Sequence, residues 1–468
     1  MTMRQEHDLL GIREVPAEVY YGVHTARALE NFAISGIPIS AYPELITAFA
    51  AIKQAAALSN RELGLLDEAR TQAIVAACKE IRAGKLHEQF VVDMIQGGAG
   101  TSSNMNANEV IANRALELMG HTRGAYRQLH PNEHVNMSQS TNDVYPTALK
   151  IATHHGVMHL VDAMDILRVA FERKAEEFKD ILKMGRTQMQ DAVPMTLGQE
   201  FTTYAVMIGE DQERLREAVQ LIHEINMGAT AIGTGISSHP DYARLVCARL
   251  VEITGIPLTT APNLIEATQD CGAFVQLSGV LKRVAVKVSK ICNDLRLLSS
   301  GPRAGLNEIN LPAVQAGSSI MPGKVNPVIP EVVNQVAFEV IGNDVTVSFA
   351  AEGGQLQLNA FEPIIAHSIF KSVAHLRAAF LTLEQRCIAG ITANRNVLRA
   401  YVENSIGLVT ALNPYIGYAN ATAIAVEAHA TGRGVYELVL EKKLLPEATL
   451  AKILRPETLT MPQGITLE

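Results

Sequence analysis

Two long stretches of this chain contain no proline and follow the pattern of an amphipathic helix. Residues 197–226 carry apolar side chains at i, i+3 and i+4 positions, and residues 267–300 are interrupted only by Gly272 and Gly279. A helix of about 30 residues is roughly 45 Å long. Because such a rod must bury its apolar stripe along its whole length, we expect a bundle of long helices that also self-associates.

The chain of 468 residues exceeds the size of one ordinary hydrophobic core, so we expect several domains. Short strands and turns are expected near the N-terminus, before the helical patterns begin. Pro146 is expected in the first turn of a long helix that continues towards Phe178. We predict three domains: a mixed, mostly helical one at residues 1–141, a central long-helix bundle at 142–392 and a small helical one at 393–468.

The composition excludes several classes of function. The formal charge is −8, from 48 acidic and 40 basic residues, and no Lys/Arg cluster marks a nucleic-acid surface. We find neither a stretch of about 18 apolar residues nor an apolar signal core at the N-terminus, so we expect no membrane span and no secretory signal. The five cysteines are scattered, without a Cys-x-x-Cys pair, which favours reduced thiols in a cytoplasmic protein.

Residues 317–327, Gly-Ser-Ser-Ile-Met-Pro-Gly-Lys-Val-Asn-Pro, predict a shaped loop with chemical groups on it. The glycines permit unusual backbone conformations, and Pro322 and Pro327 prevent a helix. Lys324 and Asn326 can hold a carboxylate, while a flanking serine can act on the carbon beside it. An ordinary polar surface loop would explain a few of these residues but not the whole run.

Three further segments share one physical feature with this loop. Residues 97–106, 138–143 and 185–194 each place hydroxyl groups in a loop between helices or just ahead of one. Hydroxyls and free backbone N–H groups at such places bind anions. Four of them predict one site for a small dianion, and a bundle of several chains would bring distant loops together.

These four segments resemble the signatures of the fumarase/aspartase superfamily, and the resemblance extends from about Asp8 into the C-terminal region. The Gly-Gly-Ala-Gly-Thr and Gln-Ser-Thr-Asn-Asp blocks are most similar to the aspartase branch, the aspartate ammonia-lyases. The resemblance implies a mainly α, three-domain fold whose long helices assemble into a tetrameric helical core. It also implies composite active sites, each built from three chains of a homotetramer.

The implied reaction is the reversible deamination of L-aspartate to fumarate and ammonia. It is an anti elimination in which a base removes a proton from Cβ and the charge spreads into the β-carboxylate as an aci-form. Ser318 matches the family's catalytic base. The matching substrate-binding residues are Thr101, Ser140, Thr141 and Ser319 for the β-carboxylate, Lys324 and Asn326 for the α-carboxylate, and Thr187 and Asn142 near the amino group.

Gln188 departs from the pattern of many relatives, which carry a histidine after the threonine of Gly-Arg-Thr. Glutamine cannot transfer a proton at neutral pH, but it can accept a hydrogen bond from the substrate ammonium. Loss of ammonia needs no proton donor, whereas loss of water does, so Gln188 favours deamination. The alternative is that Gln188 only packs behind the site.

Other functions remain possible from the sequence. The chain can be a fumarase or another amino-diacid lyase of the superfamily, or an inactive structural member of the same scaffold. His155, His159 and Asp162 have metal-compatible helical spacing, but a solvated helix face explains them better, so we predict no metal site. His134 lies either in a second anion-binding turn or in a simple turn. We expect no required cofactor, and activation by divalent cations is not readable from the sequence.

Overall fold

The computed structural model describes residues 2–462 and is mainly α-helical, as the sequence predicts. The chain divides into two units of dense internal packing. Unit 1 comprises the described residues up to Val161, together with Glu213–Ala285 and Phe338–Arg377. Unit 2 comprises Asp162–Gln212, Val286–Ala337 and the described residues from Ala378 onward.

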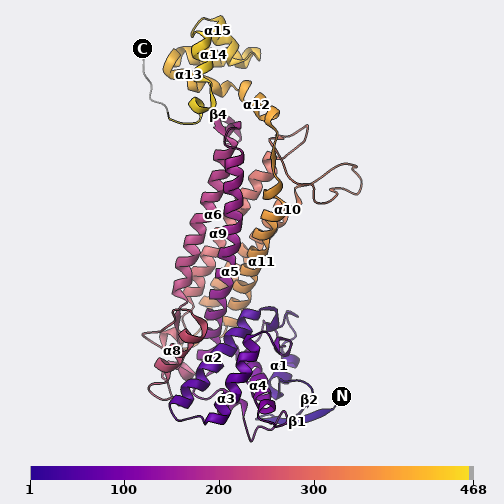
Figure 1. The fold of residues 1–468 in the computed structure, drawn as a ribbon, viewed down its shortest axis with the longest axis vertical. Coiled ribbons are helices and arrows are strands. Elements are labelled where there is room, and N and C mark those ends of the chain that lie inside the picture. The colour runs from indigo at the N-terminus through magenta and orange to yellow at the C-terminus, as the bar shows by residue number, and fades with distance from the viewer. Residues whose placement is uncertain (1, 463–468) are drawn as a thin grey trace. The chain divides into compact units, whose positions relative to one another are not determined.

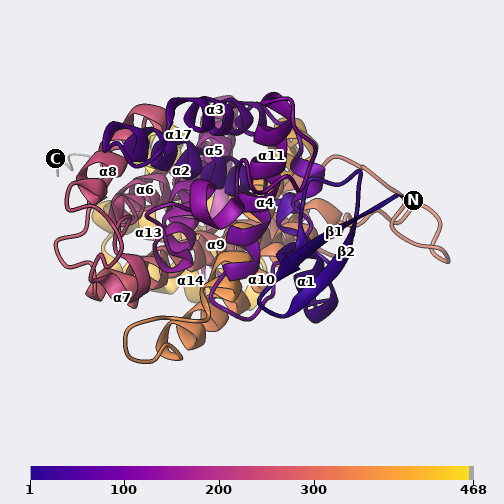
Figure 2. The same ribbon diagram turned by 90° about the horizontal axis from the view of Figure 1, so that it is seen from below.

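Unit 1 contains a β-hairpin and a layer of helices in which α2 packs on α3, α4 and α8 (Figures 1 and 2). Fully buried side chains such as Phe49, Ile74 and Val110 form its core. Strands β1 and β2 pair in antiparallel register and β5 and β6 in parallel. The elements are β1 (Met3–Asp8), β2 (Gly11–Pro16), α1 (Val23–Asn31), α2 (Pro43–Glu62), α3 (Glu68–Arg82), α4 (Thr101–Leu118), β5 (Glu224–Ile225), α7 (Thr230–Gly233), α8 (Tyr242–Thr254) and β6 (Thr259–Thr260).

Five long helices contribute residues to both units. The two proline-free stretches become α6 and α9, so their prediction as long helices is confirmed. Polar side chains link neighbouring helices within each unit: Ser278 donates to Asp344 at 2.9 Å, and Asn334 donates to the Ser289 hydroxyl at 2.8 Å. The five are α5 (Thr141–Glu177), α6 (Leu197–Leu221), α9 (Gly272–Leu298), α10 (Val328–Glu352) and α11 (Glu362–Arg386).

The expected position of Pro146 in the first turn of its helix is wrong. Helix α5 begins at Thr141, so Pro146 lies inside it and cannot donate to the carbonyl of Asn142 four residues earlier. The Asn226 side-chain amide donates to that carbonyl instead, at 2.9 Å. This substitute donor allows α5 to start early enough to include Thr141 and Asn142.

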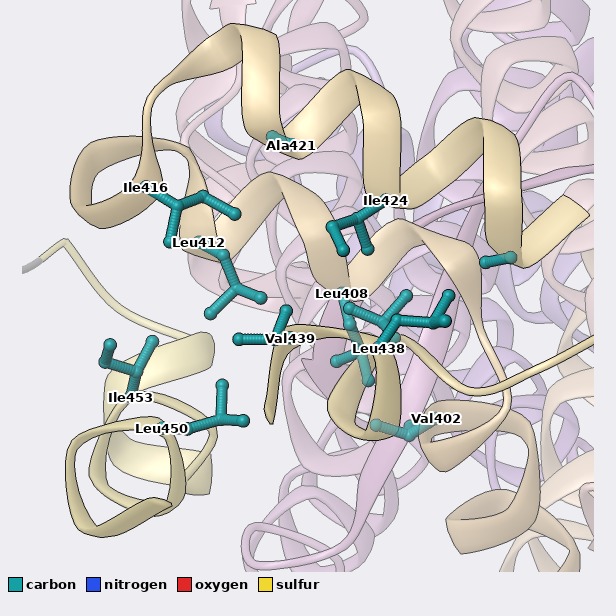
Figure 3. Packing of buried hydrophobic residues seen from close by; sticks show 12 residues of the cluster. Val402, Leu408, Leu412, Ile416, Ala421, Ile424, Leu438, Val439, Leu450 and Ile453 are labelled. Carbon is teal, nitrogen blue, oxygen red and sulfur yellow. The ribbon is translucent and has the colours of Figure 1, made fainter. Parts of the chain in front are cut away.

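Unit 2 ends in short helices around an apolar cluster (Figure 3). Leu412, Leu438 and Leu450 are fully buried there and approach one another from different helices. Two antiparallel hairpins complete the unit. The elements are β3 (Leu182–Thr187), β4 (Gln190–Thr196), β7 (Ile309–Asn310), β8 (Thr392–Ala393), α12 (Arg395–Glu403), α13 (Val409–Ile416), α14 (Tyr418–Thr431), α15 (Val435–Glu441), α16 (Glu447–Ile453) and α17 (Pro456–Leu459).

One helix of the described residues, Glu362–Gly390, is long and apolar enough to cross a membrane by length and composition alone. Of its most apolar window, 61% is buried inside the protein. A core helix passes the same test, so this feature is weak evidence for a membrane span.

Candidate active site

The loop before α4 has a backbone that only small residues tolerate. Gly98, Ala99 and Gly100 have φ values of 89°, 53° and 86°, which lie in the left-handed region. A Cβ atom at Gly100 would lie 2.2 Å from the ring of Tyr145, so glycine is required there. This turn delivers Thr101 to the first position of α4, where its side chain is exposed and its hydroxyl donates to the Gly98 carbonyl at 2.7 Å.

The start of α5 holds the second group of predicted residues. The Ser140 N–H donates to the Asp143 carboxylate at 2.9 Å, and the Asn142 N–H donates to the Ser140 hydroxyl at 3.3 Å. Asp143 is fully buried, and burial raises the pKa of its carboxyl to about 6 although three backbone N–H groups oppose this. Ser140, Thr141 and Asn142 remain half-buried and open to a ligand.

Asn142 is held by two contacts within unit 1. Its Nδ2 donates to the Ala231 carbonyl at 2.7 Å, and its own carbonyl accepts from Asn226. Because Nδ2 is already engaged, the side-chain oxygen of Asn142 is left to accept a hydrogen bond. That polarity suits a substrate ammonium, which only donates.

The β3–β4 hairpin of unit 2 presents Thr187 and Gln188 at its tip. Thr187 pairs with Gln190, which leaves a two-residue loop in which Gln188 and Met189 have φ values of 53° and 64°. Two left-handed residues in such a loop are typical of a type I′ turn, where Asn-Gly would be unstrained. The chain therefore accepts backbone strain to expose Gln188 at this position.

A buried ionic cluster fixes the base of this hairpin. Arg186 and Lys183 both contact Glu308, which is fully buried, with the Lys183 ammonium 3.2 Å from one carboxylate oxygen. Lys183 also pairs with Glu200. Because Arg186 directly precedes Thr187, Glu308 anchors the strand that carries the predicted substrate contacts. The sequence did not single out Glu308, since its partners lie more than 100 positions away along the chain.

The loop between β7 and α10 surrounds Ser318 with backbone donors (Figure 1). The N–H groups of Ile320 and Met321 donate to the Ser318 hydroxyl oxygen at 3.2 and 2.9 Å. Hydrogen bonds to an oxygen favour its charged form, so this geometry lowers the cost of an alkoxide at Ser318. Ser319 is exposed beside it.

The two ends of the same loop are tied together. The Gly317 N–H donates to the Lys324 carbonyl at 2.8 Å, and Asn326 Nδ2 donates to the Gly317 carbonyl at 2.7 Å. A Cβ atom at Gly317 would lie 2.6 Å from the Lys324 carbonyl oxygen, which explains the glycine. Lys324 itself is exposed, and no acidic partner holds its ammonium within the described part of the chain.

The predicted residues thus form two structural groups. Thr101, Ser140, Thr141 and Asn142 lie in unit 1, at the N-termini of α4 and α5. The second group belongs to unit 2 and comprises Thr187, Gln188, Ser318, Ser319, Lys324 and Asn326. Each group combines hydroxyls or amides with an exposed or half-buried position, as a binding site for a polar ligand requires.

The remaining histidines form other arrangements. His134 Nδ1 accepts from the His130 N–H at 2.8 Å, as in a simple turn, and burial lowers its pKa. His159 lies 3.6 Å from Glu44. Within residues 2–462, no group of three or more His, Cys, Asp or Glu is placed to hold a metal ion. All five cysteines are free and buried.

The fold and these loops define a lyase of the fumarase/aspartase type. Residues 11–342 match the family model described as Lyase, and residues 408–461 match the one described as Fumarase C C-terminus. The chain belongs to this lyase family. It is 62% identical over 467 residues to the aspartate ammonia-lyase of Pseudomonas aeruginosa, covering 100% of this chain and 98% of the relative. The aspartate ammonia-lyase of Escherichia coli is 57% identical over 462 residues, covering 98% and 97%.

Solved structures agree with this assignment. A Brucella melitensis protein described as fumarate lyase:delta crystallin bound to cobalt has a TM-score of 0.96 and 54% identity, with 98% of this chain and 100% of that one covered. The class II fumarase of Schistosoma mansoni has a TM-score of 0.93 and 34% identity, with 99% and 100% covered.

Proposed function

We propose that this chain is an aspartate ammonia-lyase, a carbon–nitrogen lyase that converts L-aspartate reversibly to fumarate and ammonia. The observation that carries the proposal is its identity of 57–62% to several aspartate ammonia-lyases over nearly the full length of each chain. The identity to the Schistosoma fumarase over a similar length is only 34%.

In the proposed mechanism, Ser318 acts as the base. Its oxygen accepts from two backbone N–H groups, which supports the alkoxide form that can remove a proton from Cβ. The electrons of the C–H bond move into the β-carboxylate, which becomes a dianionic aci-form. Collapse of this intermediate forms the C=C bond and breaks the Cα–N bond, and ammonia leaves neutral because the substrate amine was protonated.

The other predicted residues bind the two carboxylates and the amine. Hydroxyl and amide donors from Thr101, Ser140, Thr141 and Ser319 stabilise the charge that develops on the β-carboxylate. Lys324 and Asn326 hold the α-carboxylate. Asn142, Thr187 and Gln188 receive the ammonium, and the free side-chain oxygen of Asn142 supports this role.

We further propose that the active enzyme is a homotetramer with composite sites, each built from three chains. Exposed apolar side chains on α10 support self-association: Phe338, Val345 and Phe349 are 61%, 52% and 72% exposed. Their spacing of seven and four residues places them on one face of the helix. Light scattering tests this, and a Phe338→Glu/Phe349→Glu double variant should dissociate and lose activity together.

The chemistry needs no cofactor in this proposal, since every step is assigned to a side chain or a backbone group. Dialysis against a chelator followed by an assay with and without Mg²⁺ tests whether a divalent cation activates the enzyme. We also propose a cytoplasmic location, consistent with five free buried thiols.

The deciding experiment follows fumarate by its ultraviolet absorbance after separate addition of L-aspartate and L-malate to the purified protein. Fumarate from aspartate, with equimolar ammonia, supports the proposal. Fumarate from malate alone would make the chain a fumarase. No product from either substrate, with the tetramer intact, would favour an inactive structural member.

A further inference from the structure

Lys53 is a fully buried cation whose hydrogen-bond partners carry no charge. It lies on α2, and its ammonium donates to Asn104 Oδ1 at 2.7 Å, Asn136 Oδ1 at 2.8 Å and Gln139 Oε1 at 2.9 Å. An ammonium group has three protons, so all of its donors are used. A buried charge is costly, and a fold that retains one with three matched acceptors uses it for more than packing.

The Lys53 ammonium determines which way the Asn104 amide points. Because ammonium only donates, the oxygen of Asn104 must face Lys53, and its Nδ2 must face the opposite side. There Nδ2 donates to the Thr141 hydroxyl oxygen at 3.1 Å and to Asn136 Oδ1 at 3.2 Å. Asn104 therefore connects the buried cation to the first residue of α5.

This orientation also determines the role of Thr141. Its oxygen accepts from Asn104, so its only proton is free to donate to another group. Thr141 is half-buried and open to a ligand, while Lys53 and Asn104 are sealed from solvent. A chain of hydrogen bonds that begins at a cation polarises each following donor and strengthens the last one.

We propose that Lys53 and Asn104 are positioning residues that hold Thr141 as an obligate hydrogen-bond donor towards an anionic ligand. The inference rests on the proposed function, in which Thr141 contacts the β-carboxylate of aspartate. Asn104 lies three residues after Thr101 on α4, so the same network also ties the two hydroxyls of unit 1 to one buried support.

The experiment is a double-mutant cycle on the full tetrameric enzyme. Asn104→Asp keeps the shape and gives Lys53 an ionic partner, but it offers Thr141 only oxygen atoms, so the Thr141 proton turns away from the ligand. Thr141→Val removes the same donor isosterically. Each should lower kcat/KM for aspartate by about 10²–10³-fold, while the melting temperature stays within a few degrees of wild type.

The double variant identifies the mechanism. If Asn104 acts through Thr141, Asn104→Asp in the Thr141→Val background should cost no more than about threefold further in kcat/KM. Losses that multiply would overturn the proposal, because the damage would then not pass through Thr141. Asn104→Asp with near-normal kcat/KM would overturn it as well.

Two controls separate this proposal from its premises. Asn108→Asp buries the same charge one turn further along α4, away from Thr141, and should keep kcat/KM within a few-fold of wild type; a loss equal to that of Asn104→Asp would overturn the proposal. A wild-type enzyme that makes no fumarate from aspartate overturns the proposed function. An active enzyme with unimpaired Thr141→Val overturns the pocket assignment, and with it this inference.

Discussion

The Asn226 side chain donates to the backbone carbonyl of Asn142 at 2.9 Å, and this is the carbonyl that Pro146 leaves without a helical donor. A proline inside a helix normally destabilises it. Here the missing N–H is replaced by a buried side-chain amide from another segment of unit 1. The exchange leaves the start of α5 intact and attaches Asn142 to the segment that follows α6.

We therefore expect Asn226→Leu to destabilise the protein by about 1–3 kcal/mol, the cost of leaving a buried carbonyl without a donor. The fall in activity should be larger than that of other core variants of equal stability, because Asn142 moves. In a Pro146→Ala background the restored N–H can serve the carbonyl, so Asn226→Leu should cost less than half as much. Chemical denaturation of the four proteins checks this, and equal costs in both backgrounds would contradict it.

Ser318→Ala should lower kcat for aspartate by at least about 10³-fold, since the proposed base is removed while both carboxylate pockets remain. Binding of succinate, a dicarboxylate without the reacting amine, should change less than threefold, as measured by calorimetry. Ser319→Ala, one residue further, should affect succinate binding and rate together. Substantial turnover by Ser318→Ala would exclude the serine as the base.

Lys324→Met should raise KM and lower kcat together, because the α-carboxylate loses its cation in the ground state and in the transition state. We expect kcat/KM to fall by about 10²–10³-fold. The exposed ammonium contributes little to folding, so the melting temperature should not change. Lys443→Met provides a surface control. Unchanged kinetics would remove Lys324 from the site.

The long helices could be predicted because their causes are local. Residues 267–300 contain no proline, and α9 occupies Gly272–Leu298 of that stretch. The prediction for Pro146 failed because its compensating donor, Asn226, lies 84 positions away. Sequence periodicity cannot reveal a hydrogen bond between such distant segments.

The site could be predicted only as far as its motifs extend. The loop carrying Ser318 was found from its composition, but the two N–H groups that support its oxygen follow from a backbone conformation that the sequence does not specify. Lys53 has the pattern of an ordinary helix lysine, and its three partners are 51, 83 and 86 positions away. A buried cation is recognised only once the fold removes it from water.

The strained tip of the β3–β4 hairpin predicts an increase in stability. Met189 has a φ of 64° and is 64% exposed, so Met189→Gly should stabilise the hairpin by about 0.5–1 kcal/mol. Activity should stay near wild type, because Met189 has no assigned role. Gln188→Gly relieves the same strain but should lower kcat/KM for aspartate. Comparison of melting temperature and kcat/KM separates the two residues, and a destabilised Met189→Gly would refute the strain argument.

Glu362 predicts a dependence of stability on pH. It is buried at the start of α11, where burial raises the pKa of its carboxyl to about 8, although the Lys150 ammonium opposes this shift. A raised folded-state pKa means that the contribution to stability is complete below the unfolded value of about 4.5 and is lost as the pH rises through 8.

Glu362→Gln removes this titration and should therefore be more stable relative to wild type at pH 8 than at pH 5. The gain should be roughly 2–4 kcal/mol at most. Melting temperatures measured across this range check the prediction, with Glu213→Gln as a control because that carboxylate is exposed. A difference between Glu362→Gln and wild type that stays constant from pH 5 to pH 8 would show that the Glu362 carboxylate is already ionised at the lower pH, against the effect of its burial.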